Sequence, residues 1–390
     1  KVHYTAEFFA ANMTVEIDNT DKLKVLVSDA INMGIQFELP DINRGTYRFE
    51  PIGNTEVRYG LGAIKGSGEQ AIEAIVRERE VSGPFRSLFD FVARVDKSRL
   101  NKRTVEALIR AGAFDNIERN RAALLASVDL AFDYAYRQSV NEGQAGLFDM
   151  SADGHGASTQ EPALVWVTPW GTRERLMQEK AALGFYLSGH LFDENEMEIR
   201  RLVTQRLDVL AESRDPQLVA GVVASDIRIV NGQRGRLGIF RLDDKTATLE
   251  VTVDDAQLQQ YREVLKEDQV LVMQVTARQD RFSGGLRLQV QAIWDLPEAR
   301  CRFGKFLQVA VNGRVPDVQA IVRQFPPQTA PASEEGMTPS HKGLKVRLRV
   351  IRDDASCDIE LDQRSRFYPS DAALASWAAQ AHNQDAQVIY

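Results

Sequence analysis

The stretch Ile64-Lys-Gly-Ser-Gly-Glu-Gln-Ala-Ile-Glu-Ala-Ile75 decides the fold of the first part of this chain. Two glycines, Gly66 and Gly68, bracket one small residue, and apolar residues at helical spacing follow directly. Glycine permits a tight turn and leaves backbone N–H groups uncovered at the positive end of the new helix. This pattern predicts the hairpin of a helix-hairpin-helix, which binds phosphate without reading bases. The alternative is a glycine turn between two core helices.

A second helical pair follows with the same layout. Asn101 is the predicted N-cap of a helix that Gly112 ends. The turn before this helix is rich in lysine and arginine, and positive charge at a helix N-terminus opposes the helix dipole. A phosphate partner explains that placement, and the alternative is a solvated turn. Across both hairpins we expect DNA contacts from Lys65, Gly66, Ser67, Gly68, Lys97, Lys102 and Arg103.

Length and composition bound the class of protein. The 390 residues, 44% of them hydrophobic, are enough for two to four domains. We find no signal peptide and no apolar run long enough to span a membrane, and two cysteines make no disulfide framework or zinc motif, so we expect a reduced, cytoplasmic compartment. The formal net charge of −7 counts against a free-standing nucleic-acid binder, so any DNA contact must come from local basic patches. Because the chain begins inside a predicted helix, we expect a fragment of a longer protein.

Two β-containing modules are predicted in the second half. From about residue 216 the apolar period changes to two, and five strands with a helix between the third and fourth predict an OB-fold barrel. Residues 306–390 then predict a small two-layer module of β-α-β-β-α-β order. The fold class is therefore multidomain α+β. The residues expected to bind a single strand of nucleic acid are Arg234, Arg236, Phe240, Arg281 and Phe282. For Phe240 the alternative is a position in the barrel core.

Catalytic patterns are missing from the sequence. No Asp-x-Asp pair offers the close carboxylates of a two-metal site. Asp358, Glu360 and Asp362 alternate along one predicted strand, where a solvated face is the favoured interpretation. We therefore expect no catalytic residue, no metal and no cofactor in this segment, which predicts a nucleic-acid-binding and docking assembly.

Five runs of sequence together are specific enough to indicate a family. They are Lys1-Val-His-Tyr-Thr-Ala-Glu-Phe-Phe9, Pro40-Asp-Ile-Asn43, Tyr59-Gly-Leu-Gly-Ala-Ile-Lys-Gly66, Arg110-Ala-Gly-Ala-Phe-Asp115 and Gly184-Phe-Tyr-Leu-Ser-Gly-His190. These runs resemble the alpha subunits of bacterial DNA polymerase III, which are C-family replicative polymerases. The resemblance runs in order from residue 1 to about 295 and is weaker beyond. Leu191 departs from the proline expected after His190, which affects only the local turn.

The resemblance implies a division into six parts. It also implies that a palm domain with the catalytic aspartates and Mg²⁺ lies upstream, so that this segment is the non-catalytic part of a DNA-directed DNA polymerase. The parts are 1–45, the end of the fingers; 46–148, a helix-hairpin-helix domain for duplex DNA and the sliding clamp; 149–170, a flexible linker; 171–204, connecting helices; 205–297, the OB-fold near the single-stranded template; and 298–390, a module for the tau subunit of the clamp loader.

The run Gln144-Ala-Gly-Leu-Phe148 resembles the internal clamp-binding motif of that family. It keeps Gln144, Leu147 and Phe148, whereas Ala145 replaces a frequent leucine and predicts weaker affinity; Gly146 completes the motif. A Ser- and Gly-rich stretch follows, so we expect an extended peptide at the edge of a mobile loop.

Two other interpretations remain open. One is a stand-alone DNA-binding accessory protein, and the other is the error-prone paralogue of the same polymerase family. A start inside a helix argues against the first, and the clamp motif with a full final module argues against the second. The upstream coding sequence distinguishes them, because only a polymerase has a nucleotidyltransferase palm there.

Overall fold

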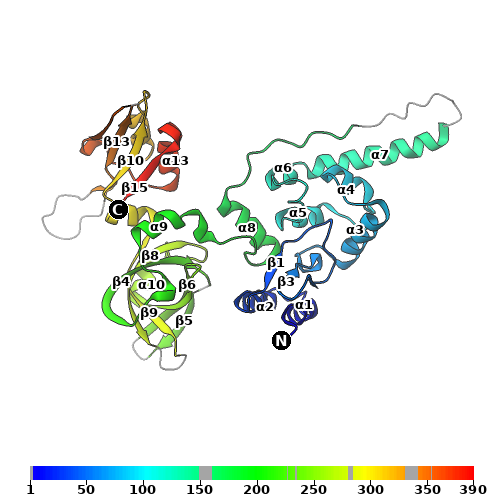
Figure 1. Cartoon of the computed structure of the whole chain (residues 1–390), viewed down its shortest axis with the longest axis horizontal. Helices are drawn as coiled ribbons and strands as arrows, with labels where there is room; N and C mark the ends of the chain where they lie inside the picture. The colour runs from blue at the N-terminus through cyan, green and yellow to red at the C-terminus, as the bar shows by residue number, and fades with distance from the viewer. Residues whose placement is uncertain are drawn as a thin grey trace. The chain divides into compact units, whose positions relative to one another are not determined.

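The computed structural model describes residues 3–148, 160–225, 227–232, 235–279, 284–329, 341–352 and 354–390. They form two compact units, Lys1–His190 and Leu191–Tyr390 (Figure 1). No helix in these ranges is both long enough and apolar enough to cross a membrane. The division into six parts stays a prediction.

The first unit is mainly helical, as its apolar periodicity predicts. Asparagine side chains cap three of its helices: Asn19, Asn101 and Asn120 each accept a hydrogen bond of 2.9–3.1 Å from the backbone N–H three residues on. Gly112, at φ +86°, follows the end of its helix, as predicted. The helices are α1 (Thr5–Val15), α2 (Thr20–Asn32), the 3₁₀ turn η1 (Leu61–Ala63), α3 (Glu69–Ser82), α4 (Leu88–Arg94), α5 (Lys102–Arg110), α6 (Arg121–Ala126), α7 (Val128–Phe148) and α8 (Thr172–Leu183).

A small sheet lies in the same unit. A short hairpin encloses Gly53, because β2 (Glu50–Pro51) pairs antiparallel with β3 (Glu56–Arg58). A third strand, β1 (Gln36–Glu38), pairs in parallel with β3. Three residues are too few for a period-two signal, so the sequence did not predict β1.

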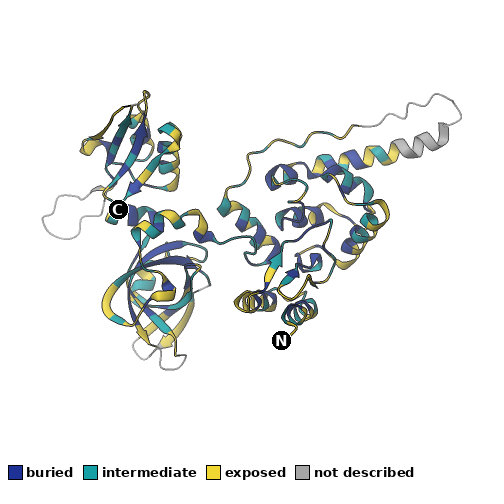
Figure 2. Cartoon of the chain, in the orientation of Figure 1, coloured by how far each residue is buried: buried dark blue, intermediate teal, exposed yellow. Residues whose placement is uncertain are grey.

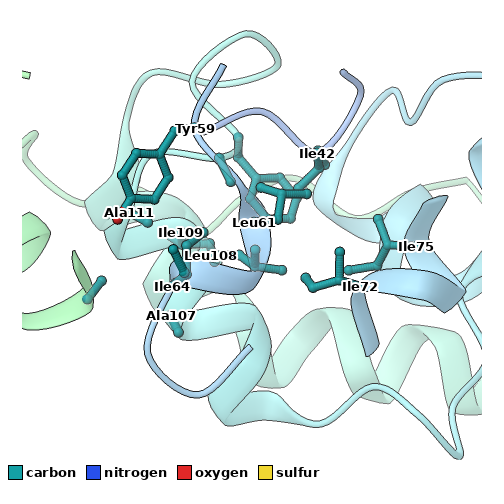
Figure 3. Close-up of a cluster of buried hydrophobic side chains, with 14 of the residues drawn as sticks. Ile42, Tyr59, Leu61, Ile64, Ile72, Ile75, Ala107, Leu108, Ile109 and Ala111 are labelled. Atoms are coloured by element: carbon teal, nitrogen blue, oxygen red, sulfur yellow. The ribbon is translucent and has the colours of Figure 1, made fainter. Parts of the chain in front are cut away.

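One hydrophobic core supports both hairpins of the first unit (Figure 2). Ile64 enters it from the glycine turn, Ile72 and Ile75 from α3, and Leu108 and Ile109 from α5; each is at most 2% exposed (Figure 3). The predicted apolar face of α3 is therefore confirmed. Because both helices that follow a hairpin pack into this core, their N-termini are held by the same packing.

The second unit contains a six-stranded sheet of order β4-β8-β9-β7-β6-β5. An additional pairing of β4 with β6 joins the sheet to itself through two residue pairs, which gives the partly open barrel of an OB-fold. The five predicted strands are β4, β6, β7, β8 and β9, and the helix α10 (Asp255–Gln260) lies between the third and fourth of these, as predicted. The prediction missed β5, which forms a sixth strand at the edge of the sheet. The strands are β4 (Ser213–Val223), β5 (Arg228–Gly232), β6 (Gly235–Asp243), β7 (Thr248–Asp254), β8 (Val270–Gln279) and β9 (Leu286–Asp295).

The last part has the predicted β-α-β-β-α-β order. Its four-stranded sheet has the order β14-β13-β10-β15, with β10 and β13 parallel. Trp377 of α13 is fully buried in a core with Leu307 and Val346. The elements are β10 (Phe306–Val311), α12 (Val318–Gln324), β13 (Val346–Ile351), β14 (Ser356–Glu360), α13 (Asp371–Gln380) and β15 (Ala386–Ile389), with a two-stranded ribbon of β11 (Gln328–Thr329) and β12 (His341–Lys342).

A buried arginine connects the flanks of the barrel with the last module. Arg300, 1% exposed in its side chain, makes two hydrogen bonds of 2.7 Å to Glu198 and one of 2.7 Å to Asp371. The Tyr390 hydroxyl donates to the same Glu198 carboxylate at 2.6 Å. Arg300 belongs to α11 (Leu296–Phe303) and Glu198 to α9 (Glu196–Leu202); the 3₁₀ turns η2 (Leu191–Glu194) and η3 (Leu207–Val209) flank α9, and η4 (Gln363–Ser365) and η5 (His382–Gln384) lie in the last module.

Candidate nucleic-acid interface

The first hairpin is an open glycine turn. Gly66 and Gly68 have φ values of +85° and +65°, a region that L side chains rarely adopt, and a Cβ at either position would meet no atom within 4 Å. Glycine is therefore required by backbone conformation and not by crowding. Gly68 is the N-cap of α3 and supplies no capping side chain, so the first N–H groups of that helix lack the usual cap.

Two of the predicted residues of this turn have different surroundings. Ser67 is 1% exposed, and both its hydroxyl and its N–H donate to the Ile64 carbonyl, at 2.8 and 3.1 Å. Ser67 thus stabilises the turn and has no donor left for a ligand. Lys65 donates its backbone N–H to Ala182 at 2.9 Å, while its side chain is exposed. Lys65, Gly66 and Gly68 are therefore the accessible members of the predicted set.

The basic residues of the second hairpin differ in their bonding partners. The Lys97 amine donates to the Ala135 carbonyl of α7 at 2.6 Å. Lys102 forms an ion pair with Asp129, and this hydrogen bond raises the pKa of the Lys102 amine. Arg103 is exposed, and its guanidinium forms no hydrogen bond or ion pair with any residue that the structure describes. Of the three predicted cations, Arg103 is the most available to a phosphate.

Direct hydrogen bonds join the two hairpins. The Thr104 hydroxyl, in the first turn of α5, donates to the Gly66 carbonyl at 3.1 Å. The Arg99 guanidinium donates to the Gln70 side chain at the start of α3. The start of each helix is therefore tied to the other, and the two turns form one surface. The sequence predicted both turns but gave no signal for Thr104, which reads as an ordinary helix residue.

A buried ionic cluster lies in the same unit. Arg121, 2% exposed in its side chain, binds Asp115 through hydrogen bonds of 2.5 and 2.7 Å, and its Nη1 lies 3.6 Å from the Glu179 carboxylate. Glu179 accepts the backbone N–H groups of Leu187 and Ser188 at 2.5 and 2.8 Å. This cluster joins two of the runs quoted above, 110–115 and 184–190.

The predicted clamp motif has an unexpected backbone conformation. Helix α7 extends to Phe148, so Gln144, Ala145, Gly146, Leu147 and Phe148 lie in its last turns. The prediction of an extended peptide is wrong for this structure, because the backbone of these residues is helical. The Ser- and Gly-rich stretch 151–159 lies outside the described residues.

On the barrel, the structure describes two of the five predicted single-strand residues, Phe240 and Arg236. Phe240 is 1% exposed and lies in the barrel core, so its prediction as a stacking residue is wrong and the core alternative holds. Arg236 has the same strand parity as Phe240 and forms an ion pair of 2.9 Å with Asp255 at the start of α10. Arg234, Arg281 and Phe282 lie outside the described residues.

The alternating acidic residues of β14 are engaged by cations. Asp358 binds Arg349 across the strands at 3.0 Å, and this hydrogen bond lowers the pKa of Asp358. Glu360 lies 3.5 and 3.6 Å from Lys345 and Arg347. The favoured interpretation of a solvated strand face agrees with these exposed pairs.

Comparison with known proteins supports the family resemblance. A helix-hairpin-helix motif model matches residues 34–124. The chain is 41% identical to DNA polymerase III subunit alpha of Neisseria meningitidis serogroup B over 95% of its own length and 31% of the relative's. The corresponding values are 38%, 96% and 32% for Vibrio cholerae, and 36%, 96% and 32% for Escherichia coli K12. The predicted resemblance is confirmed, and the chain spans about a third of the length of these curated relatives.

Solved structures add no argument. A mitochondrial single-stranded DNA binding protein from S. cerevisiae is 17% identical, with a TM-score of 0.19, and the match covers 21% of this chain and 95% of that one. A small single-stranded DNA-binding protein from Streptomyces coelicolor is 16% identical, with a TM-score of 0.20, over 22% and 95%. The OB-fold assignment therefore rests on the strand pairing alone.

Proposed function

We propose that this chain is the C-terminal part of the catalytic alpha subunit of a bacterial replicative DNA polymerase, acting in the cytoplasm. Its hairpins bind the backbone of duplex DNA, and its barrel binds single-stranded template. Residues 144–148 bind the sliding clamp, and residues 298–390 bind the tau subunit of the clamp loader. Polymerisation belongs to the full-length protein, in which an upstream palm holds Mg²⁺. Sequence identity of 36–41% to these polymerase subunits over at least 95% of the chain supports this assignment.

The observation that carries the proposal is the pair of linked hairpins. The Gly66 and Gly68 N–H groups donate to no described residue, and the helix that follows has no side-chain cap. Arg103 stands at the start of the adjacent helix, which Thr104 fixes to the Gly66 carbonyl. Phosphate oxygens accept from uncapped N–H groups at a helix start and from an arginine fork. Since none of these donors is specific to a base edge, the expected binding has no sequence preference.

The test is the salt dependence of duplex binding for Arg103→Gln. Each lost phosphate contact lowers the slope of log affinity against log salt by about 0.9 for duplex DNA. We expect this decrease for Arg103→Gln and an unchanged slope for Arg86→Gln. Arg86 is another exposed arginine of the same unit; it precedes α4, away from the hairpin at the other end of that helix.

Two results would contradict the proposed interface. If Arg103→Gln keeps the wild-type slope, the second hairpin does not touch the duplex. If both variants lower the slope equally, binding reflects total charge and no defined surface. Circular dichroism of both variants establishes that neither result comes from misfolding.

A further inference from the structure

A cavity of about 690 Å³ lies within the second unit. Its walls come from three regions: the end of α10 with the loop after it, the junction of β9 with α11, and the last module. Small-molecule sites in proteins typically have volumes of about 300–1,000 Å³. The cavity therefore has the size of a small-molecule site, and none of the residues predicted to contact DNA or the clamp lines it.

Two arginines of the cavity wall have no carboxylate partner. The Arg302 guanidinium carbon lies 4.9 Å from the centre of the Trp294 ring. Arg366 donates from Nη1 to the Gly343 carbonyl at 3.1 Å and from Nε to the Gln363 side chain at 2.8 Å. Neither guanidinium forms an ion pair with any residue that the structure describes. Both cations are thus held in place by neutral groups, and their charge is available to an anionic ligand.

A carboxylate in the same cavity has an oxygen to spare. Asp295 caps α11, and its Oδ1 accepts the Glu298 backbone N–H at 2.8 Å, the one hydrogen bond that this carboxylate makes with described residues. Lys342, a cation of the same wall, is paired with Glu298 at 2.5 Å. Burial raises the pKa of the Asp295 carboxyl, because the charge is partly withdrawn from water. A ligand that offers N–H donors to Asp295 would replace the lost hydration.

Aromatic side chains supply the flat surface of the cavity. Tyr261, Trp294 and Tyr368 all line it. Burial, followed by the negative charge of Asp295, raises the pKa of the Tyr368 hydroxyl, which therefore stays protonated. Planar ring systems pack well against such side chains.

These features together describe a ligand with an anionic end, a planar body and an edge of N–H donors. A nucleotide has all three. Guanine fits the carboxylate best, because its ring N–H and its 2-amino group are adjacent donors that the two oxygens of one carboxylate accept. Adenine and cytosine offer one amino group beside an acceptor nitrogen, and the N–H of uracil lies between two carbonyls that a carboxylate repels.

We propose that this cavity binds a free guanine nucleotide, whose base edge donates to Asp295 and whose diphosphate is bound by Arg302 and Arg366. The site goes beyond the nucleic-acid contacts proposed above, because its ligand is a single nucleotide and no strand. Its walls belong to the barrel, α11 and the last module, so a bound nucleotide stabilises the folded second unit.

The experiment is isothermal titration calorimetry of the whole chain with guanosine, inosine and adenosine diphosphate. Inosine lacks only the 2-amino group, and a hydrogen bond to a charged acceptor is worth about tenfold or more in affinity. We expect guanosine diphosphate to bind more tightly than inosine diphosphate by at least about that factor. Asp295→Asn keeps an oxygen for the helix cap and should remove this preference.

A second pair of variants tests the diphosphate end. Arg302→Gln/Arg366→Gln should weaken guanosine diphosphate binding by at least about tenfold, because two charge-assisted contacts are lost. Arg314→Gln/Arg323→Gln removes two exposed arginines of the same unit that do not line the cavity, and it should leave the affinity unchanged. Thermal melting of each variant separates the loss of a contact from the loss of folding.

Four results would overturn the proposal. The first is no binding of guanosine diphosphate by the wild-type chain at millimolar concentration, and the second is equal affinity for the three diphosphates. The third is unchanged affinity in Arg302→Gln/Arg366→Gln. The fourth is displacement of the bound nucleotide by inorganic diphosphate, or by an oligonucleotide that ends in guanine, at equal concentration. The cavity would then bind any such anion or the end of a strand.

Discussion

Arg121 shows how one side chain organises the first unit. Burial alone lowers the pKa of this guanidinium, but the hydrogen bonds and charge of Asp115 raise it more, so the net direction is upward. The cation is therefore retained in a nearly water-free site, where its loss leaves Asp115 and Glu179 without their partner. Breaking a buried pair in this way costs far more than removing a surface ion pair.

We therefore expect Arg121→Met to destabilise the first unit by about 3–5 kcal/mol. Hydrogen exchange with mass spectrometry in urea measures the change, because it follows peptides of residues 1–190 separately from the rest. Arg103→Met is the matched control and should cost less than about 0.5 kcal/mol, since that side chain is exposed. A loss below about 1 kcal/mol for Arg121→Met would mean that the cluster is not a major support.

Single residues also mark the limit of sequence reasoning. Asn101 and Gly112 were predicted because a cap and a left-handed residue leave local signals. Arg121 was not predicted, because an arginine at a helix start gives no sign of burial. On β6 the signal was present but missed: Phe240 and Leu242 alternate with Arg241, so placing Phe240 in the core turns Arg241 outward.

At the scale of elements, the C-terminal end of α7 differs most from expectation. The motif 144–148 is helical here, and a partner pocket that requires an extended peptide must unwind that last turn. Unwinding adds to the ordering cost of binding, so we expect modest affinity for the clamp. The order of the longer strands and helices of the second unit, by contrast, followed from their periodicity, whereas the two-residue strands β11 and β12 are too short to show it.

We expect Leu147→Ala/Phe148→Ala to abolish binding to the sliding clamp while the melting temperature changes little. Two apolar anchors carry most of the energy of such a peptide, and the last turn of a helix contributes little to folding. Tyr136→Ala/Val140→Ala changes two exposed apolar residues of the same helix and should leave clamp binding intact. Retained clamp affinity, or a large loss of stability, in the Leu147/Phe148 variant would refute the docking role.

At the scale of the whole molecule, the ionic cluster of Arg300, Glu198 and Asp371 determines which segments of the second unit are expected to fold stably on their own. Glu198 precedes the barrel, Arg300 follows it, and Asp371 lies in the last module. Cuts at residues 205 and 297 remove all three, together with α11, which packs against β8 and β9. The sequence suggested these cuts because the change of period marks the strands, whereas the cluster joins residues far apart in the chain.

We accordingly expect residues 191–390 to unfold in one transition, and residues 205–297 to unfold at a lower temperature. Differential scanning calorimetry of the two segments measures this. Arg300→Met in the longer segment should reproduce most of the decrease, because it leaves the partly buried Glu198 carboxylate without its partner. Equal midpoints for both segments would show that the barrel is stable without its flanks.

The hydrogen bond from Thr104 to Gly66 has a consequence for cooperativity. Two weak hairpins on a flexible chain would each have to find a phosphate, and the second would lose entropy in doing so. Held at a fixed separation, the second hairpin meets its phosphate at a high effective concentration once the first is bound. The chain thus gains avidity along one stretch of backbone, and it loses that gain wherever the phosphate spacing does not match the distance between the two turns.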